Sequence, residues 1–149
     1  MRLVCLVTVL LWSAAAAFCG DARVIKVLPQ LLDKQGRNAI NPSLFDRDAY
    51  QMHLRLNTNE VSAIRFEVQY KAKGIEGPLV LRLEIRGGKT ELGKREVFET
   101  EVSAGGHFSK WGRIQFDRET SERIGRLIAW RASLVKDGEV IATQESFLW

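Results

Sequence analysis

The clearest pattern in the chain is an alternation of apolar and polar side chains in two long segments. Every second residue is apolar from Ile64 to Tyr70 and again from Leu79 to Ile85, with mostly charged or amide side chains between them. Because strand side chains point to opposite faces in turn, each segment predicts a strand with one buried and one wet face. The intervening glycines and Pro78 predict that the two strands pair antiparallel through this loop.

Shorter segments of the same kind predict the remaining strands. They are Val24–Leu28, ending at Pro29; Phe98–Val102; Trp111–Phe116; and Ile128–Leu134 with the segment that follows Asp137-Gly138. The Asp-Gly pair is typical of a two-residue hairpin turn of type I′. No internal repeat and no low-complexity segment interrupts this series.

The last hairpin predicts where the carboxyl end of the chain goes. A two-residue turn sets Lys136 opposite Glu139 and Leu134 opposite Ile141. Continued along the strands, this register sets Ile128 opposite Phe147. The segment Ser146–Trp149 is therefore expected to dock in the core, with Trp130 and Trp149 on the apolar face.

The segment Ser43–Leu56 carries two conflicting periods. Ser43 and Asp46 have the spacing of a helix N-cap and its partner, and an apolar face follows at helical spacing. That face comprises Phe45, Ala49, Met52 and Leu56. The same stretch alternates like a strand from Tyr50 to Leu56. The cap favours a helix, and the strand remains the alternative. Residues 117–125 predict one or two further helical turns that stop at Gly125.

The elements together predict the fold class. About seven strands and one short helix, with turns at regular spacing, are typical of a single antiparallel β-sandwich of immunoglobulin or fibronectin III type. We place this domain at residues 23–149. The chain lacks the Cys…Trp…Cys framework of true immunoglobulin domains. A small β-barrel or a jelly roll is the alternative architecture.

The amino-terminal segment has the layout of a secretory signal peptide. Arg2 precedes an apolar run from Leu3 to Leu11, and small residues follow. Residues 1–22 are predicted to be removed, with cleavage after Ala17 or after Ala22. The mature protein is then exported, periplasmic or secreted, with no membrane span. A retained anchor is the alternative.

The two cysteines both lie in this segment, at Cys5 and Cys19. Cleavage leaves one of them or none, so the mature domain cannot form an intramolecular disulfide and depends on its hydrophobic core. Lipidation of Cys19 is a further alternative, although Phe18 departs from the small residue expected before a lipidated cysteine.

Charge excludes one class of partner. The formal net charge is +4, and 27% of the residues are charged. The two signs alternate along the chain without a run of five basic residues. Because nucleic-acid binding surfaces gather Lys and Arg together, this pattern argues against a nucleic-acid partner.

The sequence offers no assembled catalytic or metal-binding motif. His53 and His107 lack partners at metal-ligand spacing, so no metal or cofactor is predicted. No G-x-S-x-G is present, and Leu83 occupies the place of the first P-loop glycine. Glu99 and Glu101 share a strand face and form a candidate acid pair, but such residues are typical of a wet strand face. We therefore expect a protein that is not an enzyme.

The candidate binding site is the segment from Gly105 to Arg113. It joins two glycines to aromatic and cationic side chains, and its candidate residues are His107, Phe108, Lys110, Trp111 and Arg113. An exposed Trp among polar groups can stack on a sugar ring or anchor a peptide. The alternative is that Phe108 and Trp111 cover one end of the sandwich.

Two stretches carry a resemblance. The segments GRNAINPSLFDRDAYQMHLR and AWRASLVKDGEVIATQESFLW are similar to small exported β-sandwich proteins of environmental bacteria. No activity is known for those proteins, so the resemblance implies no catalytic residue.

The expected function is therefore a non-enzymatic binding module of the cell envelope, with another envelope or extracellular protein as its partner. The alternative is a carbohydrate-binding module that uses an exposed Trp in the segment 105–113.

Overall fold

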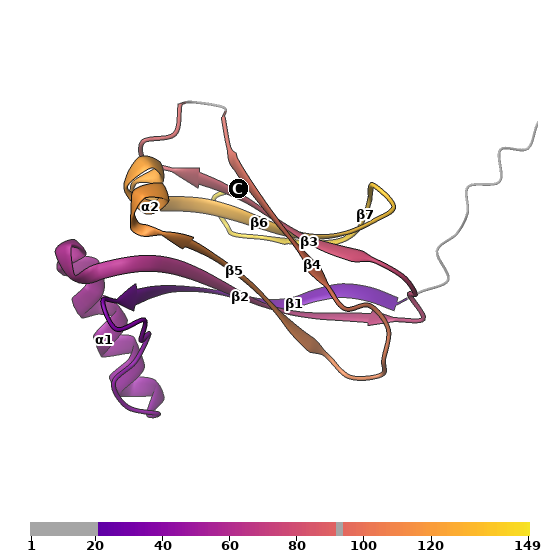
Figure 1. The fold of residues 1–149 in the computed structure, drawn as a ribbon, viewed down its shortest axis with the longest axis horizontal. Helices are drawn as coiled ribbons and strands as arrows, with labels where there is room; N and C mark the ends of the chain where they lie inside the picture. Colours follow the sequence, from indigo (N-terminus) through magenta and orange to yellow (C-terminus); the bar gives the residue numbers. More distant parts are fainter. Residues whose placement is uncertain (1–20, 92–93) are drawn as a thin grey trace, which may run out of the picture.

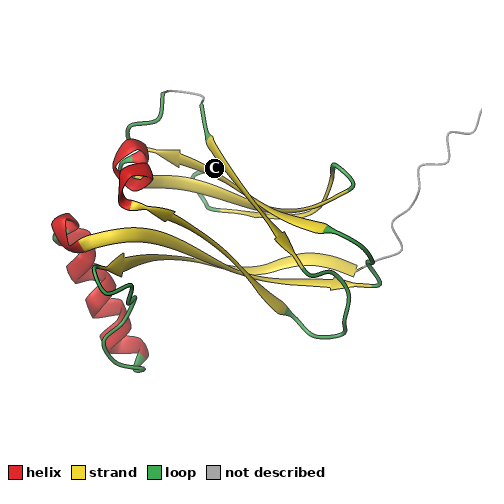
Figure 2. Cartoon of the chain, viewed as in Figure 1, coloured by secondary structure: helices red, strands yellow, loops and turns green. Residues whose placement is uncertain are grey.

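The computed structural model describes residues 21–91 and 94–149. The predicted signal segment up to residue 20, with Cys5 and Cys19, lies outside the described residues. Seven strands form two antiparallel sheets stacked as layers (Figures 1 and 2). The prediction of a single antiparallel β-sandwich is confirmed.

The strands divide three and four between the sheets. The first sheet has the order β1-β2-β5, formed by Asp21–Asp33, Val61–Lys73 and Lys110–Asp117. The second has the order β4-β3-β6-β7, formed by Glu96–Val102, Leu79–Gly87, Leu127–Lys136 and Glu139–Glu145. The fourth strand pairs with the third, as in fibronectin III domains, rather than joining the sheet of β1 as in constant immunoglobulin domains.

The core lies between the layers, where the alternating apolar positions of β2 and β3 face each other. Phe66, Val68 and Tyr70 from β2 are buried against Leu81 and Leu83 from β3. Each such side chain contributes about 1.5–3 kcal/mol by leaving water. The buried Tyr70 hydroxyl donates a hydrogen bond to the Ser103 carbonyl at 2.9 Å.

The predicted pairing of β2 with β3 is wrong. β2 pairs with β1 and β5, whereas β3 pairs with β4 and β6. The loop at residues 74–78 therefore crosses from one layer to the other. Two strands that each bury one face satisfy the same alternation whether they lie side by side or face to face, so the pattern does not separate the two arrangements.

β1 is longer than predicted, because it continues through Pro29 to Asp33. Proline is tolerated at this position since β1 is an edge strand with a partner on one side only. Leu31, two residues on, directs its backbone N–H and C=O away from β2, to a side chain of the following helix. Pro29 shares that orientation by the two-residue period of the strand.

The helix alternative for Ser43–Leu56 is confirmed, but its predicted buried face is wrong. Ser43 caps α1, Leu44–Leu56, by accepting a hydrogen bond from the Asp46 N–H at 3.5 Å. The helix buries Gln51 and Leu54, and leaves the apolar side chains of the predicted face exposed. A second helix, α2 at Arg118–Ile124, begins at the cap Asp117 and stops at Gly125. The described residues therefore contain two α-helices, where the predicted fold had one short helix, besides a short 3₁₀ turn at Thr58–Glu60.

The β6–β7 hairpin turns at Asp137-Gly138 with φ of 51° and 85°, the left-handed values of a type I′ turn. Lys136 lies opposite Glu139 as predicted. A register shift at Val135 then sets Leu134 opposite Ala142, not Ile141. The predicted register beyond this bulge is therefore wrong by one residue, which reverses the face of each later side chain.

The carboxyl end does not dock in the core. Phe147 is fully exposed, and Leu148 is largely exposed. The Trp149 ring lies outside the second sheet, 4.6 Å from the Arg86 guanidinium and 4.8 Å from that of Arg131. Trp130 does pack against the core, with partial burial. The prediction for Trp149 fails because cation–π contact with two arginines offers an aromatic ring a place on a charged surface.

Candidate functional site

The predicted binding segment forms the β4–β5 loop and the start of β5. It lies at the end of the sandwich opposite to α1 and α2 (Figure 1). Gly105 and Gly106 have φ of 73° and 91°, a conformation that glycine adopts without strain. The Gly105 N–H donates to the Ala72 carbonyl at 3.1 Å. The base of the loop is therefore held to β2 while its tip projects.

The tip carries the exposed members of the candidate set. Phe108 is 86% exposed, and His107 is exposed beside it. Lys110 differs from them, because its amine donates to the Ala104 carbonyl at 2.8 Å and its side chain is half-buried. Lys110 thus closes the loop on itself, whereas His107 and Phe108 present their side chains to solvent.

Trp111 and Arg113 share the outer face of the first sheet. Trp111 lies opposite Gln69 and is 52% exposed, and Arg113 lies opposite Glu67, with 3.0 Å between guanidinium and carboxylate. Between them Gly112 faces inward, where a Cβ would lie 2.8 Å from the Leu81 side chain. Because β5 approaches the second sheet this closely at Gly112, Trp111 lies on the outer face of the first sheet and is half-exposed there.

The face around Trp111 is polar and mainly cationic. Gln69 donates to the Ser109 hydroxyl at 2.9 Å beside the indole. The strand register places six cationic side chains on this face, against the carboxylates of Asp21 and Glu67. They are Arg23, Lys26, Arg65, Lys71, Lys73 and Arg113. The arrangement offers a flat aromatic surface with hydrogen-bond donors around it.

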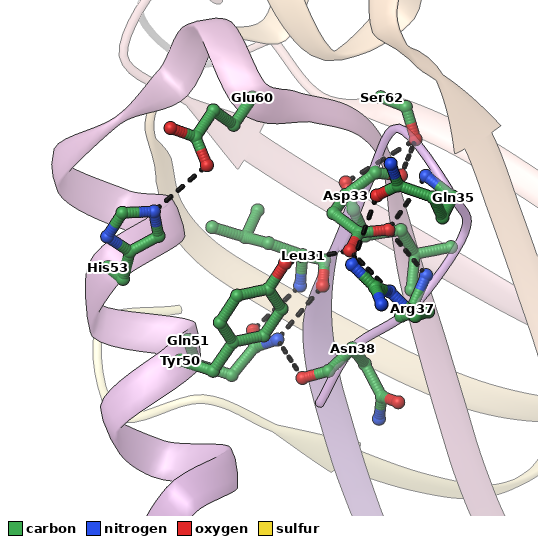
Figure 3. Close-up of polar contacts among 11 residues, drawn as sticks. Leu31, Asp33, Gln35, Arg37, Asn38, Tyr50, Gln51, His53, Glu60 and Ser62 are labelled. Carbon is green, nitrogen blue, oxygen red and sulfur yellow. Dashed lines mark hydrogen bonds and ion pairs between the residues drawn. The ribbon is translucent and has the colours of Figure 1, made fainter. Parts of the chain in front are cut away.

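The sequence reasoning missed a polar network beneath α1 (Figure 3). The Asp33 carboxylate is buried and accepts hydrogen bonds from the backbone N–H groups of Gln35 and Arg37, each at 2.8 Å. It also accepts from Arg37 Nε at 2.8 Å and from the Tyr50 hydroxyl at 2.7 Å. Burial alone would raise the pKa of Asp33, but these hydrogen bonds outweigh it and lower the pKa to about 2.

Gln51 is the second part of that network. Its side-chain carbonyl accepts from the Leu31 N–H at 2.8 Å, and its amide donates to the Leu31 carbonyl at 2.9 Å (Figure 3). The amide also donates to the Asn38 carbonyl at 2.8 Å. One side chain thus occupies the open edge of β1 as a neighbouring strand would, which blocks further pairing at that point. The contacts of Asp33 and Gln51 fix α1 on the sheet rather than form a ligand site.

The histidines and carboxylates considered in the sequence have separate roles. His53 lies 2.9 Å from Glu60 on the outside of α1, far along the chain from His107. Within residues 21–91 and 94–149, no group of three metal-binding side chains comes together. Glu99 pairs with Arg82 at 2.6 Å, which neutralises one member of the candidate acid pair.

A further buried carboxylate, Glu84, lies on the outer face of the second sheet. One carboxylate oxygen of Glu84 lies 2.7 Å from Arg95 Nε, and the other lies 2.6 Å from Arg131 Nε. Burial opposes ionisation, but the hydrogen bond and charge of Arg131 outweigh it and lower the pKa of Glu84. A hollow of about 240 Å³ adjoins these side chains, and another of about 650 Å³ opens beside Phe116 and Thr120. Neither hollow adjoins the candidate binding residues.

Within the part of the chain that is described, no helix combines the length and apolar character needed to cross a bilayer. No family model and no curated protein matches the chain.

Similarity to solved structures is confined to fold. A crystal structure of a protein from Akkermansia muciniphila aligns with a TM-score of 0.55 and 14% identity, over 86% of this chain and 72% of that one. Two crystal structures of beta-glucosidase from Kluyveromyces marxianus align with TM-scores of 0.35 and 0.38 at 14% and 10% identity. They cover 57% and 87% of this chain but only 12% and 14% of the enzyme chains.

Proposed function

We propose that this β-sandwich is an exported, non-enzymatic binding module whose β4–β5 loop docks another protein of the cell envelope or the extracellular space. The observation that carries the proposal is the exposure of Phe108 at the loop tip, close along the chain to the half-exposed Trp111. Large aromatic side chains supply most of the energy of a protein interface when a partner buries them. The anchored loop base favours binding because less of the loop must be ordered.

The test is affinity capture of the processed protein from the envelope fraction of its host, with mild cross-linking and mass spectrometry. We expect a protein captured by the wild type to be lost with Phe108→Ala. Phe147→Ala is the matched control, since that phenylalanine is also largely exposed but lies on a different surface. Equal capture by all three forms would contradict the role of the loop.

A carbohydrate-binding module is the second candidate, favoured by the surroundings of Trp111. The indole lies on a flat sheet face beside Gln69, Ser109 and Arg113, which supply the hydrogen bonds that sugar hydroxyls require. The cationic side chains of this face favour an acidic polysaccharide. Retention on such a polymer should be lost with Trp111→Ala and kept with Phe108→Ala. Capture of a protein partner, in contrast, should be lost with Phe108→Ala.

Two observations support a non-enzymatic function. Glu99 of the candidate acid pair forms an ion pair with Arg82, and His107 lies at the tip of the β4–β5 loop. Replacing Glu99 and Glu101 together with Gln should leave any hydrolytic activity of the preparation unchanged. A loss of activity in that variant would reopen an enzymatic function.

Export through removal of the predicted signal segment belongs to the same proposal, with a periplasmic or secreted protein as the product. Of the two cleavage positions, the one after Ala17 leaves β1 whole. Cleavage after Ala22 would remove Asp21 and Ala22, which pair with Lys73 and Ala72. It would also remove the carboxylate that lies 3.3 Å from Lys71. The intact mass of the processed protein distinguishes the two.

A further inference from the structure

The outward face of α1 carries an apolar stripe that the sandwich does not cover. Phe45 is 81% exposed, Met52 52% and Leu56 77%, and Ala49 is exposed between them. At about 100° per residue these four positions lie opposite Gln51 and Leu54, which face the sheet. The stripe is therefore a separate apolar surface and not an extension of the core.

The spacing of the stripe is that of a helix–helix seam. The four residues follow one another at intervals of four, three and four, as the apolar positions of a coiled coil do. The pattern is also compatible with an antiparallel copy of itself. A two-fold axis between residues 50 and 51 sets Phe45 opposite the partner's Leu56 and Ala49 opposite the partner's Met52. Each large side chain then meets a partner that fits it, and the small Ala49 leaves room for Met52.

The charges beside the stripe fit the same axis. Asp48 and Arg55 lie seven residues apart, which places them two turns apart on one flank of the stripe. Both are exposed, with Asp48 at 79%. A two-fold axis sets each flank of the stripe against the same flank of the partner helix, which runs in the opposite direction. Measured along the helix axis, Asp48 then lies within about 3 Å of the level of the partner's Arg55. In this arrangement the helix dipoles also run antiparallel.

We propose that α1 is the interface of a two-fold symmetric dimer of this chain, in which the two helices pack antiparallel. The occupant of the apolar stripe is the same stripe of a second copy. A seam of 13 helical residues is small, so the dimer belongs to the weak class of interfaces. We expect a dissociation constant of about 10 µM to 1 mM.

The dimer would give the proposed binding loops a second function. α1 and the β4–β5 loop lie at opposite ends of the sandwich, so pairing through α1 leaves both loops open (Figure 1). A dimer then presents two binding surfaces, which raises the apparent affinity for a repeated or surface-bound partner. The interface itself does not depend on the proposed function and is tested without any partner.

The test is analytical ultracentrifugation of the protein as its host expresses and processes it. The protein concentration is varied from about 1 µM to 1 mM. We expect mostly monomer at the lower limit and half or more of the chains in dimers at the upper. Asp48→Arg and Arg55→Asp should each weaken the dimer roughly five- to thirtyfold, because each replaces two attractive pairs by repulsive ones. The double exchange should restore it, since the pairs re-form with reversed sign.

Each other result overturns the proposal. A protein that stays monomeric to about 1 mM forms no such interface. A dimer that both single exchanges leave unchanged uses another surface, and so does one that the double exchange fails to restore. Glu101→Arg is the matched control, because it reverses an exposed charge on β4 and should not alter the association. The circular dichroism spectrum of every variant verifies that α1 has formed.

Discussion

The two ends of the sandwich both expose aromatic and aliphatic side chains, but they are built differently. At the α1 end, Leu54, Asp33 and Gln51 are buried, and long-range hydrogen bonds join the helix to β1. At the opposite end, the β4–β5 loop is shaped by glycines and by one lysine that bonds its own loop, and hydrogen bonds to β2 hold it at its two sides. An exposed side chain on α1 therefore belongs to a helix packed on buried residues, whereas Phe108 lies at the tip of a loop whose own side chains are not buried. The difference predicts that substitutions cost stability at one end and binding at the other.

The largest effect is expected at the centre of the α1 support. Leu54 is 0% exposed, so Leu54→Ala should lower the free energy of unfolding by about 3 kcal/mol through lost burial and a new cavity. Leu56→Ala, two residues away on the exposed stripe, should change it by less than about 0.5 kcal/mol. Urea denaturation of dilute protein measures both. Similar losses in the two variants would contradict the orientation of α1.

The next effect is a pH dependence that originates at Asp33. Because the folded pKa of about 2 lies below the ordinary value of 3.8, the folded state is stabilised above about pH 4 by roughly 2 kcal/mol. That stabilisation is lost as the pH falls from about 4 towards 2. Asp33→Asn should be less stable than the wild type at neutral pH and should lose this acid-dependent part. Thermal denaturation from pH 2 to pH 7 would show it, and parallel curves for both proteins would exclude Asp33 as the source.

A smaller effect is expected where Gln51 closes the edge of β1. Gln51→Met keeps the volume but removes the partners of the Leu31 N–H and C=O groups, which should cost about 1–2 kcal/mol. Amide exchange at Leu31 should become faster, while exchange at Val68 in the middle of the sheet follows global stability only. Unchanged protection at Leu31 would mean that Gln51 does not seal the strand edge.

The smallest effect is expected at the loop end. Lys110→Met removes the hydrogen bond to the Ala104 carbonyl and should cost about 0.5–1 kcal/mol. It should weaken binding through Phe108 more than it weakens the fold, because the loop loses its closure. A variant that keeps full binding would show that the two glycines alone are sufficient to shape the loop.

Local features of this protein were predictable from local residues. The alternation from Ile64 to Tyr70, the cap at Ser43 and the Asp137-Gly138 turn each act within a few residues, and all three formed as predicted. The candidate residues Trp111 and Arg113 could be placed on one face for the same reason, since a strand repeats every two residues.

What the sequence by itself determined was the type of most elements and, in β2 and β3, which side chains face the core and which face outward. Only the tertiary structure decided which sheet each strand joins, which face of α1 is buried and where Trp149 lies. The reason is that these choices depend on groups far apart in the chain. The backbone of β1 at Leu31 required a hydrogen-bonding partner, and Gln51 supplied it from 20 residues away. That requirement turned the polar Gln51 inward with Leu54, and it turned the most apolar stripe of the helix towards solvent.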